Sequence, residues 1–294
     1  MFVLAHLTDP HLAPLPAPRL SELIGKRGLG FLNWLRKRAA IHRTDVLELL
    51  VRDLKAQAFD HLAVTGDLIN IALEKEYAPA RAWLEHLGAP DEVTLVPGNH
   101  DIYVRATAEN AQRAWAAYMR GDELDSLPFV RRRGPAALIG LCSALPTPPF
   151  MATGLLGGEQ LARLEAVLSA LGREGLFRIV LIHHPPISAP KRYFKRLTDS
   201  EALRAVLRKH GAELVIHGHD HVRSLVWLEG PHGRIPAIGV PSASAAPDRA
   251  DEPAGYSLYE IDGVAGAWRC TAIARGFSRG GGEITELMRQ SLVS

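Results

Sequence analysis

Five short apolar segments of the sequence each end in a cluster of Asp, Asn, Gly or His residues. The segments are FVLAHLT, HLAVT, TLVP, IVLI and ELVI, and they run into Asp9-Pro10-His11, Gly66-Asp67, Gly98-Asn99-His100-Asp101, His183-His184 and His217-Gly218-His219-Asp220-His221. Each segment has the length and the aliphatic composition of a buried strand. If these strands lie side by side, their ends meet at one edge of a sheet, where open α/β sheets bind ligands.

The residue types at these strand ends are those that bind divalent metal ions. Asp, Asn and His supply oxygen and nitrogen donors suited to Mn, Fe, Co, Ni or Zn. No cysteine is among them, which argues against a structural zinc finger. Each cluster alone is compatible with an ordinary polar turn, but gathering several carboxylates and imidazoles costs on the order of several kcal/mol unless a cation compensates. We therefore predict one metal site built from distant parts of the chain.

Helical patterns separate several of these strand segments, which predicts a layered α/β fold. Apolar residues recur on one face over residues 46–54, with Thr44 as the expected N-cap, and further helices are expected over 75–87, 107–119, 158–171 and 199–210. After residue 222, four strand patterns without helices predict a second sheet or an antiparallel extension. We expect a single domain over residues 1–275 and a C-terminal tail, 276–294, in which a flexible Gly run precedes a short helix.

The five clusters resemble, in their order, the signature of the calcineurin-like metallophosphoesterase family, and the chain is similar to its class III cyclic nucleotide phosphodiesterase branch. The resemblance implies a four-layer sandwich in which two mixed β-sheets are flanked by helices. It also implies two divalent metal ions, which could be Mn, Fe, Zn, Co or Ni. The implied ligands are Asp9, His11 and His221 on one ion, Asn99, His183 and His219 on the other, and Asp67 between them.

The resemblance further implies a hydrolase of phosphoric esters that uses a hydroxide held between the two ions as its nucleophile. His100 would face the substrate and neutralise or protonate the departing oxygen, and we expect Asp101 to orient its ring. Phosphodiester hydrolysis is the predicted reaction. One alternative is a pyrophosphatase that acts on a nucleotide-linked lipid or another diphosphate. A second is a non-catalytic interaction scaffold, which typically loses metal ligands or the catalytic histidine, whereas every position is present here.

Residues 18–43, PRLSELIGKRGLGFLNWLRKRAAIHR, are rich in Lys, Arg and large apolar residues. Because this insertion begins just after two predicted ligands, we expect it to overhang the site. It could be a cap that binds a nucleotide or a lipid-linked phosphate, a surface element that contacts an anionic membrane, or an amphipathic helix packed on the domain. The candidate substrate contacts are Arg36, Lys37, Arg38 and His184. A separate run, Arg131 to Arg133, is expected to be a solvated face.

The net charge and the cysteine count of the whole chain limit the classes of partner and the cell compartments that we expect. A formal net charge of +2 over 294 residues argues against nucleic acid as a partner, and favours a small-molecule phosphoester. The two cysteines suit a reducing compartment. No apolar run approaches the ~18 residues of a membrane-spanning helix, and the first residues do not resemble a signal peptide. We expect a cytoplasmic protein, with residues 18–43 as the candidate contact to the inner membrane face.

Overall fold

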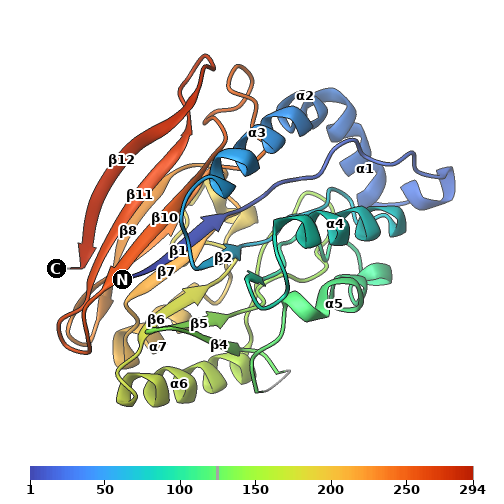
Figure 1. Ribbon diagram of the computed structural model, residues 1–294. Coiled ribbons are helices and arrows are strands. Elements are labelled where there is room, and N and C mark those ends of the chain that lie inside the picture. Colours follow the sequence, from blue (N-terminus) through green and yellow to red (C-terminus); the bar gives the residue numbers. More distant parts are fainter. Residues whose placement is uncertain (124–125, 294) are drawn as a thin grey trace.

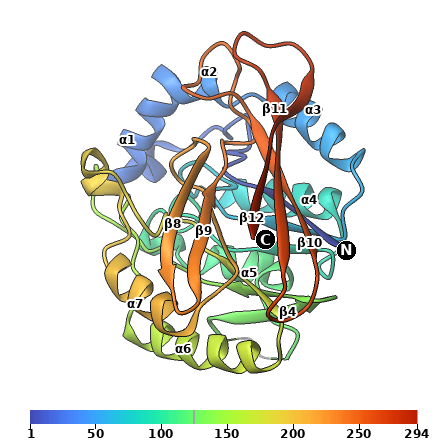
Figure 2. The same cartoon turned by 90° about the vertical axis from the view of Figure 1, so that its left-hand side faces the viewer.

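Two six-stranded mixed β-sheets pack against each other in the computed structural model, and helices cover the outer face of each sheet (Figure 1). The structure describes residues 1–123 and 126–293. The predicted four-layer α/β sandwich is therefore confirmed. Figure 2 shows the short helices α1 and α2 at one end of the sandwich and the long helices α6 and α7 at the other.

The first sheet joins strands from both ends of the chain in the order β12-β11-β10-β1-β2-β3. Its strands are β1 (Phe2–Leu7), β2 (His61–Val64), β3 (Val93–Leu95), β10 (Gly255–Asp262), β11 (Arg269–Phe277) and β12 (Ile284–Val293). The strands β1, β2 and β3 are parallel, whereas β10, β11 and β12 are antiparallel to their neighbours. Helices α3 (Thr44–Lys55), α4 (Glu74–Leu87) and α5 (Asn110–Trp115) pack on its outer face.

The second sheet has the order β4-β5-β6-β7-β9-β8. Its strands are β4 (Phe129–Arg133), β5 (Ala136–Gly140), β6 (Phe177–Leu181), β7 (Leu214–His217), β8 (Ser224–Gly230) and β9 (Gly233–Gly239). The four strands β5, β6, β7 and β9 are parallel. Helices α6 (Gly158–Arg173) and α7 (Ser200–His210) cover its outer face.

Burial of both faces explains why the central strands read as unbroken apolar runs. In β6, Phe177, Ile179 and Leu181 pack between the two sheets, whereas Val180 packs under α6 and α7. All four side chains are fully buried. A strand buried on both sides needs apolar residues at every position, and this requirement is typical of parallel sheets covered by helices. The carboxyl ends of β1, β2 and β3 then meet those of β6 and β7 at one rim of the sandwich.

Three local predictions differ from the structure. Thr44 does not cap α3, because its hydroxyl donates to the Ala13 carbonyl at 2.9 Å and helix α3 begins at this residue. The helix expected over 107–119 is shorter, since α5 spans Asn110–Trp115 and a 3₁₀ turn follows it. The short helix expected in the tail is wrong, because residues 284–293 form β12. Glu, Leu, Met and Arg favour a helix locally, but pairing along the edge of β11 outweighs that propensity.

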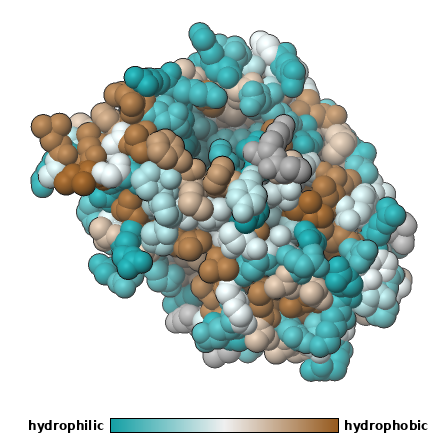
Figure 3. Space-filling model, turned by 180° about the vertical axis from the view of Figure 1, so that it is seen from behind, coloured by the Kyte–Doolittle hydropathy of each residue, from teal (hydrophilic) through white to brown (hydrophobic). Residues whose placement is uncertain are grey.

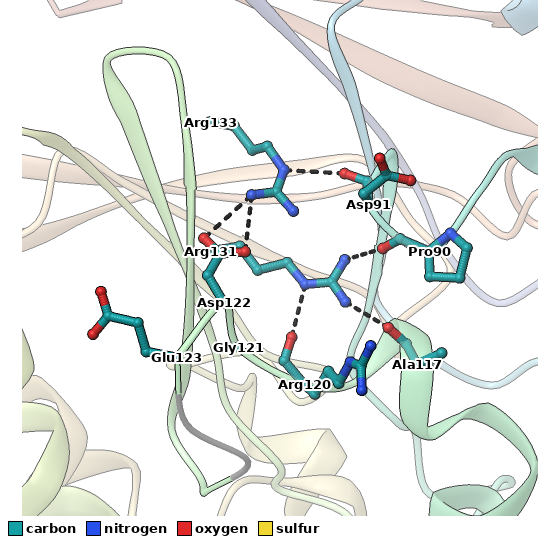
Figure 4. A pocket seen from close by; sticks show the side chains of 9 residues that line it. All are labelled: Pro90, Asp91, Ala117, Arg120, Gly121, Asp122, Glu123, Arg131 and Arg133. Carbon is teal, nitrogen blue, oxygen red and sulfur yellow. Dashed lines mark hydrogen bonds and ion pairs between the residues drawn. The ribbon is translucent and has the colours of Figure 1, made fainter.

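The arginine run 131–133 lies in β4, and the expectation of a solvated face is wrong for Arg131. Its side chain is only 3% exposed. Figure 4 shows its guanidinium surrounded by backbone carbonyls, and it donates to those of Val93 at 2.7 Å, Ala117 at 2.8 Å and Arg120 at 2.8 Å. Arg133 lies nearer the surface and pairs with Asp122 at 3.0 Å. Arg131 therefore ties β3 and the 3₁₀ turn after α5 to the second sheet.

The insertion 18–43 is helical over most of its length. It contains a 3₁₀ turn (Leu20–Leu23), helix α1 (Lys26–Asn33), a π-helical turn (Trp34–Arg38) and α2 (Ala39–Ile41). It projects from the domain beside α4 (Figure 1). Within residues 1–123 and 126–293, no helix combines the length and the hydrophobicity that crossing a bilayer demands.

Candidate metal centre

The predicted ligands lie together at the rim where five parallel strands end, although they span residues 9 to 221 of the sequence. Asp9 and His11 follow β1, Asp67 follows β2, Asn99 follows β3, His183 follows β6, and His219 and His221 follow β7. Except for His221, all are buried. The structure thus brings together every residue of the predicted ligand set.

The first group of ligand atoms contains Asp9, His11 and His221. His221 Nε2 lies 3.1 Å from Asp9 Oδ1 and 3.3 Å from His11 Nε2. The Oδ2 atom of Asp67 lies 3.8 Å from His11 Nε2. Asp9, His11, Asp67 and His221 together form a cluster whose ligand atoms all lie within 4.8 Å of one another, which is close enough to hold a metal ion.

The second group contains Asn99, His183 and His219. His183 Nε2 lies 3.2 Å from Asn99 Oδ1 and 3.2 Å from His219 Nδ1. The same oxygen of Asp67, Oδ2, lies 3.5 Å from His183 Nε2. This atom therefore lies within 4 Å of a histidine nitrogen of each group, so Asp67 could contact a metal ion held by either group.

Hydrogen bonds to the backbone fix the orientation of three of these histidines. His11 Nδ1 lies 3.2 Å from the Ile69 carbonyl, His183 Nδ1 lies 2.7 Å from the Thr65 carbonyl, and His219 Nε2 lies 2.8 Å from the Lys195 carbonyl. A nitrogen that faces a carbonyl carries the proton, so the other ring nitrogen has its lone pair free. In each case that second nitrogen points into the ligand group, which is the arrangement that metal-binding histidines adopt.

The distances within each group fit a shared cation better than a hydrogen-bonded network. Two lone-pair nitrogens 3.2 or 3.3 Å apart gain nothing from each other unless a proton or a cation lies between them. Two ligand atoms that each lie ~2.1 Å from one ion are separated by roughly 3.0–3.5 Å. The residues present therefore fit a pair of divalent ions.

The charges of the buried ligand residues also favour a bound cation. Burial disfavours a charge on Asp67, yet the facing His183 and His100 hold its pKa well below the usual range. Burial likewise opposes a charge on His183, but the carboxylate of Asp67 raises its pKa to about 10. A buried carboxylate at the centre of the group thus attracts positive charge, which either a proton or a metal ion can supply.

The backbone at the ligands is strained. Asp9, His11, Asp67, His219 and His221 have φ angles between 40° and 70°, in the left-handed region that side chains with a Cβ rarely adopt. Such strain concentrates at functional sites, where the surrounding structure imposes it. Two glycines make room for these turns. A Cβ on Gly98 would lie 2.2 Å from Asp67 Oδ1, and one on Gly218 would lie 2.0 Å from Thr8 Oγ1.

Asp101 does not orient the ring of His100, so this prediction is wrong. Its two carboxylate oxygens accept hydrogen bonds from four backbone N–H groups, those of Asp67, Leu68, Ile69 and Gly98, at 2.8 to 3.2 Å. The carboxylate therefore has no free position for an imidazole. Asp101 instead joins the loop after β2 to the loop after β3.

His100 lies beside the first ligand group, with its ring centroid 5.0 Å from that of His11. Its Nδ1 atom contacts the Asn70 carbonyl, so this carbonyl holds the ring in place of Asp101. Its Nε2 atom lies 2.8 Å from an Nη atom of Arg38. Burial, reinforced by the charge of Arg38, lowers the pKa of His100 to about 3. His100 is thus a neutral imidazole whose Nε2 points toward the predicted ligands.

A pocket of about 360 Å³ opens over the ligands. Of the candidate substrate contacts in the insertion, Lys37 and Arg38 line it, whereas Arg36 is exposed and is not among the lining residues described. His184 is buried, and its two ring nitrogens lie 2.8 Å from Ser143 Oγ and 3.2 Å from the Ala152 carbonyl. These contacts occupy both nitrogens, which favours a packing role for His184 beneath the second ligand group.

Sequence reasoning missed His42. This residue lies next to the end of the insertion and is buried, and its ring centroid lies 4.4 Å from that of His11, with the two ring planes tilted by 58°. Its Nδ1 atom lies 2.9 Å from Ser244 Oγ, and with His11 and His221 it forms a second group that could hold a metal ion. The signal in the sequence is its place at the end of a segment expected to overhang the site. Ser244 follows β9, and no motif marks it.

Comparisons with known proteins agree with this site. The sequence model for calcineurin-like phosphoesterase matches residues 2–223. The chain is 28% identical over 220 residues to a probable cyclic nucleotide phosphodiesterase of Synechococcus sp., and the alignment covers 74% of this chain and 77% of that protein.

Two solved structures share the fold. A dimetal phosphatase from Danio rerio superposes with a TM-score of 0.66 at 16% identity, covering 99% of this chain and 98% of that one. The purple acid phosphatase PPD1 from yellow lupin (Lupinus luteus) seeds gives a TM-score of 0.60 at 14% identity, covering 99% of this chain and 53% of that one.

The fold is a four-layer sandwich, and histidines and carboxylates gather at the carboxyl ends of its parallel strands. This fold and this metal-binding site are typical of hydrolases of phosphoric esters. The family match covers well over half of the sequence. The chain belongs to the calcineurin-like phosphoesterase family.

Proposed function

We propose that the chain is a phosphodiesterase that works with two divalent metal ions. The observation that supports this most directly is the position of Asp67 Oδ2, which lies 3.8 Å from His11 Nε2 and 3.5 Å from His183 Nε2. The two ligand groups meet at this one oxygen. Such a pair of ions supplies a water of lowered pKa and stabilises the charge that develops on the phosphoryl oxygens. The donor set accepts Mn, Fe, Zn, Co or Ni.

The residues of the chain would divide the remaining work. Asp67 offsets the repulsion between the two cations, and the Thr65 and Ile69 carbonyls keep His183 and His11 in the tautomer that binds metal. His100, held through Nδ1 by the Asn70 carbonyl, presents Nε2 to the departing oxygen. The neutral ring keeps its proton on Nδ1, so Nε2 must first gain a proton; we propose that the anionic substrate favours this protonation and that the imidazolium then donates the Nε2 proton to the leaving oxygen.

The resemblance to a probable cyclic nucleotide phosphodiesterase supports a diester substrate over a monoester. A small phosphodiester suits a pocket of about 360 Å³, and a nucleotide would direct its base toward the insertion 18–43. The test is hydrolysis of bis(p-nitrophenyl) phosphate by the Mn-loaded protein. Asp67→Ala should lose at least about 10³ in kcat/KM and bind less metal. The matched control is Asp45→Ala on the surface of α3, which should keep full activity. Wild-type turnover by Asp67→Ala would refute the bridging role.

A second candidate, cleavage of a diphosphate linked to a lipid, is supported by the surface of the insertion. Leu20, Ile24 and Leu35 are 90%, 79% and 61% exposed. Figure 3 shows hydrophobic surface on the projection that this segment forms. Exposed aliphatic side chains beside Arg36 and Lys37 suit the interface of an anionic membrane.

This candidate predicts binding to vesicles as well as activity. The protein should sediment with vesicles that contain an anionic phospholipid, and Leu20→Ser combined with Ile24→Ser should abolish that sedimentation. Equal recovery with and without vesicles would leave the soluble phosphodiester as the proposed substrate. A cytoplasmic location accords with either candidate and remains a proposal, to be checked by fractionation of the producing cells.

The non-catalytic scaffold has less support. Such a protein has no need for three ligand imidazoles oriented by backbone carbonyls and a strained backbone at the same rim. If the Mn-loaded protein hydrolyses no phosphodiester or diphosphate, the scaffold becomes the better account.

A further inference from the structure

Arg38 reaches from the insertion into the predicted metal centre. It ends the π-helical turn Trp34–Arg38. One Nη atom lies 2.8 Å from His100 Nε2, and the other lies 2.8 Å from His11 Nε2. Its Nε atom is buried and has no hydrogen-bond partner within the described part of the chain. The guanidinium therefore lies between a predicted metal ligand and the residue predicted to serve the leaving group.

The contact to His11 cannot coexist with a metal ion on the same nitrogen. His11 Nδ1 faces the Ile69 carbonyl, so Nε2 has the single lone pair available for binding. That lone pair can accept a hydrogen bond from Arg38 or bind a cation, but not both. A metal ion at His11 thus requires the Nη atom of Arg38 to take another acceptor.

The contacts of Arg38 within the described residues are to ring nitrogens of His11 and His100. His100 offers one nitrogen, and that nitrogen already accepts from the first Nη atom. The guanidinium is half-buried and lines the pocket over the predicted ligands. A guanidinium with unpaired N–H groups that lines such a pocket is complementary to a phosphate, whose oxygens accept two parallel hydrogen bonds.

The rest of the insertion holds Arg38 in place. Lys26 Nζ donates to Thr147 Oγ1 at 2.6 Å, and Arg27 Nε donates to the Ile71 carbonyl at 3.1 Å. Helix α1 packs so closely that a Cβ on Gly30 would lie 2.7 Å from the Tyr103 hydroxyl. The turn that ends at Arg38 is therefore anchored at several points, so little freedom is lost when the guanidinium binds a ligand.

We propose that Arg38 binds the phosphoryl oxygens of the substrate, exchanging its contact with His11 for the phosphate when a metal ion occupies His11 Nε2. This inference rests on the proposed metal centre and names a residue that positions the substrate. Arg38 differs from the other cations of the pocket in its neighbours. Arg192, for example, also lines the pocket but is paired with Asp220 at 3.3 Å.

The test compares Arg38→Gln, Arg38→Lys and the control Arg43→Gln in Mn-loaded protein. Arg43 belongs to the same insertion, but its side chain is exposed and pairs with Asp45 on the surface. The readouts are the Mn²⁺ dissociation constant, the inhibition constant of inorganic phosphate, and kcat and KM on bis(p-nitrophenyl) phosphate. A thermal midpoint for each variant verifies that it is folded.

Arg38→Gln should weaken phosphate inhibition at least about tenfold and lower kcat/KM by at least about 10², because a charge-assisted bidentate contact is lost. Arg38→Lys keeps the positive charge but cannot donate two parallel hydrogen bonds. Its phosphate inhibition and its kcat/KM should therefore lie between those of Arg38→Gln and the wild type. Mn²⁺ should bind to Arg38→Gln as tightly as to the wild type or more tightly, because a competitor for His11 is removed. Arg43→Gln should match the wild type in all three measurements.

Two results would overturn the inference. Unchanged phosphate inhibition in Arg38→Gln would show that the guanidinium does not bind the phosphoryl group, and weakened Mn²⁺ binding would show that Arg38 supports the ligands instead. If Arg38→Gln does not fold, phosphate inhibition and Mn²⁺ binding of Arg38→Lys test the inference instead. Failure of the proposed function is separate, since wild-type protein without any hydrolysis can still bind Mn²⁺ and phosphate.

Discussion

Replacing Asp101 with Asn tests whether this residue builds the site or takes part in the chemistry. Its carboxylate accepts four backbone N–H groups, two on each oxygen. The amide of Asn keeps one oxygen and presents an NH₂ group where the other oxygen was. Two backbone donors are then left unpaired and face a further donor.

The expected loss follows from that count. A buried donor without a partner costs about 1–3 kcal/mol, so two cost about 2–6 kcal/mol. This is a large part of the 5–15 kcal/mol typical of a folded domain. Because the donors belong to the loops that hold Asp67 and Asn99, the metal ligands should shift as well.

Urea unfolding followed by circular dichroism measures the stability, and elemental analysis measures the bound metal. Asp101→Asn should unfold at a clearly lower urea concentration and retain less metal than the wild type. The matched control is Asp45→Asn at the surface of α3, for which we expect a change of about 0.5 kcal/mol or less. An Asp101→Asn variant with wild-type stability and metal content, but without turnover, would contradict the structural role and restore a catalytic one.

Three further substitutions test other contacts. Gly98→Ala should lose at least about half of the bound metal and most of the activity, because the new Cβ would lie 2.2 Å from Asp67 Oδ1. The measurement is the metal content of the purified variant. The control is Gly158→Ala, because a Cβ at Gly158 meets no atom within 4 Å. Burial opposes a charge on Asp53, but hydrogen bonds from Arg275 and Tyr256 lower its pKa, so its contribution to stability is present above pH ~4 and is lost as the pH falls through the folded pKa. Asp53→Asn should therefore cost about 1 kcal/mol at pH 7 and progressively less below pH ~4, as measured by urea unfolding at several pH values; a constant difference would contradict this. Arg131→Met should destabilise the domain by about 2–4 kcal/mol without changing kcat, since it leaves several buried carbonyls unpaired far from the ligands.

The shared rim of the polar clusters could be predicted from the sequence because its geometry is simple, whereas the individual ligands were implied by the resemblance to the family. Strands that are buried on both faces read as apolar runs, and residues at their carboxyl ends must share one rim of the sandwich. Asp9, Asp67 and His183 could thus be assigned to one site from their positions alone. The oxygen and nitrogen donors of these residue types then indicated a site for divalent metal ions.

Other features depended on contacts that the sequence does not encode locally. The role of Asp101 was mispredicted because a residue next to His100 in the chain need not contact its ring, and the Asn70 carbonyl occupies that place. Arg131 looked like a surface charge because its partners are backbone carbonyls, which leave no mark in a sequence. The edge strand β12 was mistaken for a helix because the pairing that stabilises it comes from β11.

The position of Arg38 shows the same limit. The sequence marked the insertion as basic and placed it near the site, but did not separate Arg36, Lys37 and Arg38. In the structure these adjacent residues lie in one helical turn, where successive side chains point in different directions. Only Arg38 of the three contacts His11 and His100.

The most direct test of the account is the metal content of the purified protein after reconstitution with Mn²⁺ and removal of the excess. Elemental analysis should find about two ions per chain in the wild type and fewer than about one in Asp67→Ala, because one oxygen serves both groups. A wild-type protein that retains no metal, or an Asp67→Ala variant that retains as much as the wild type, would contradict the two-ion centre.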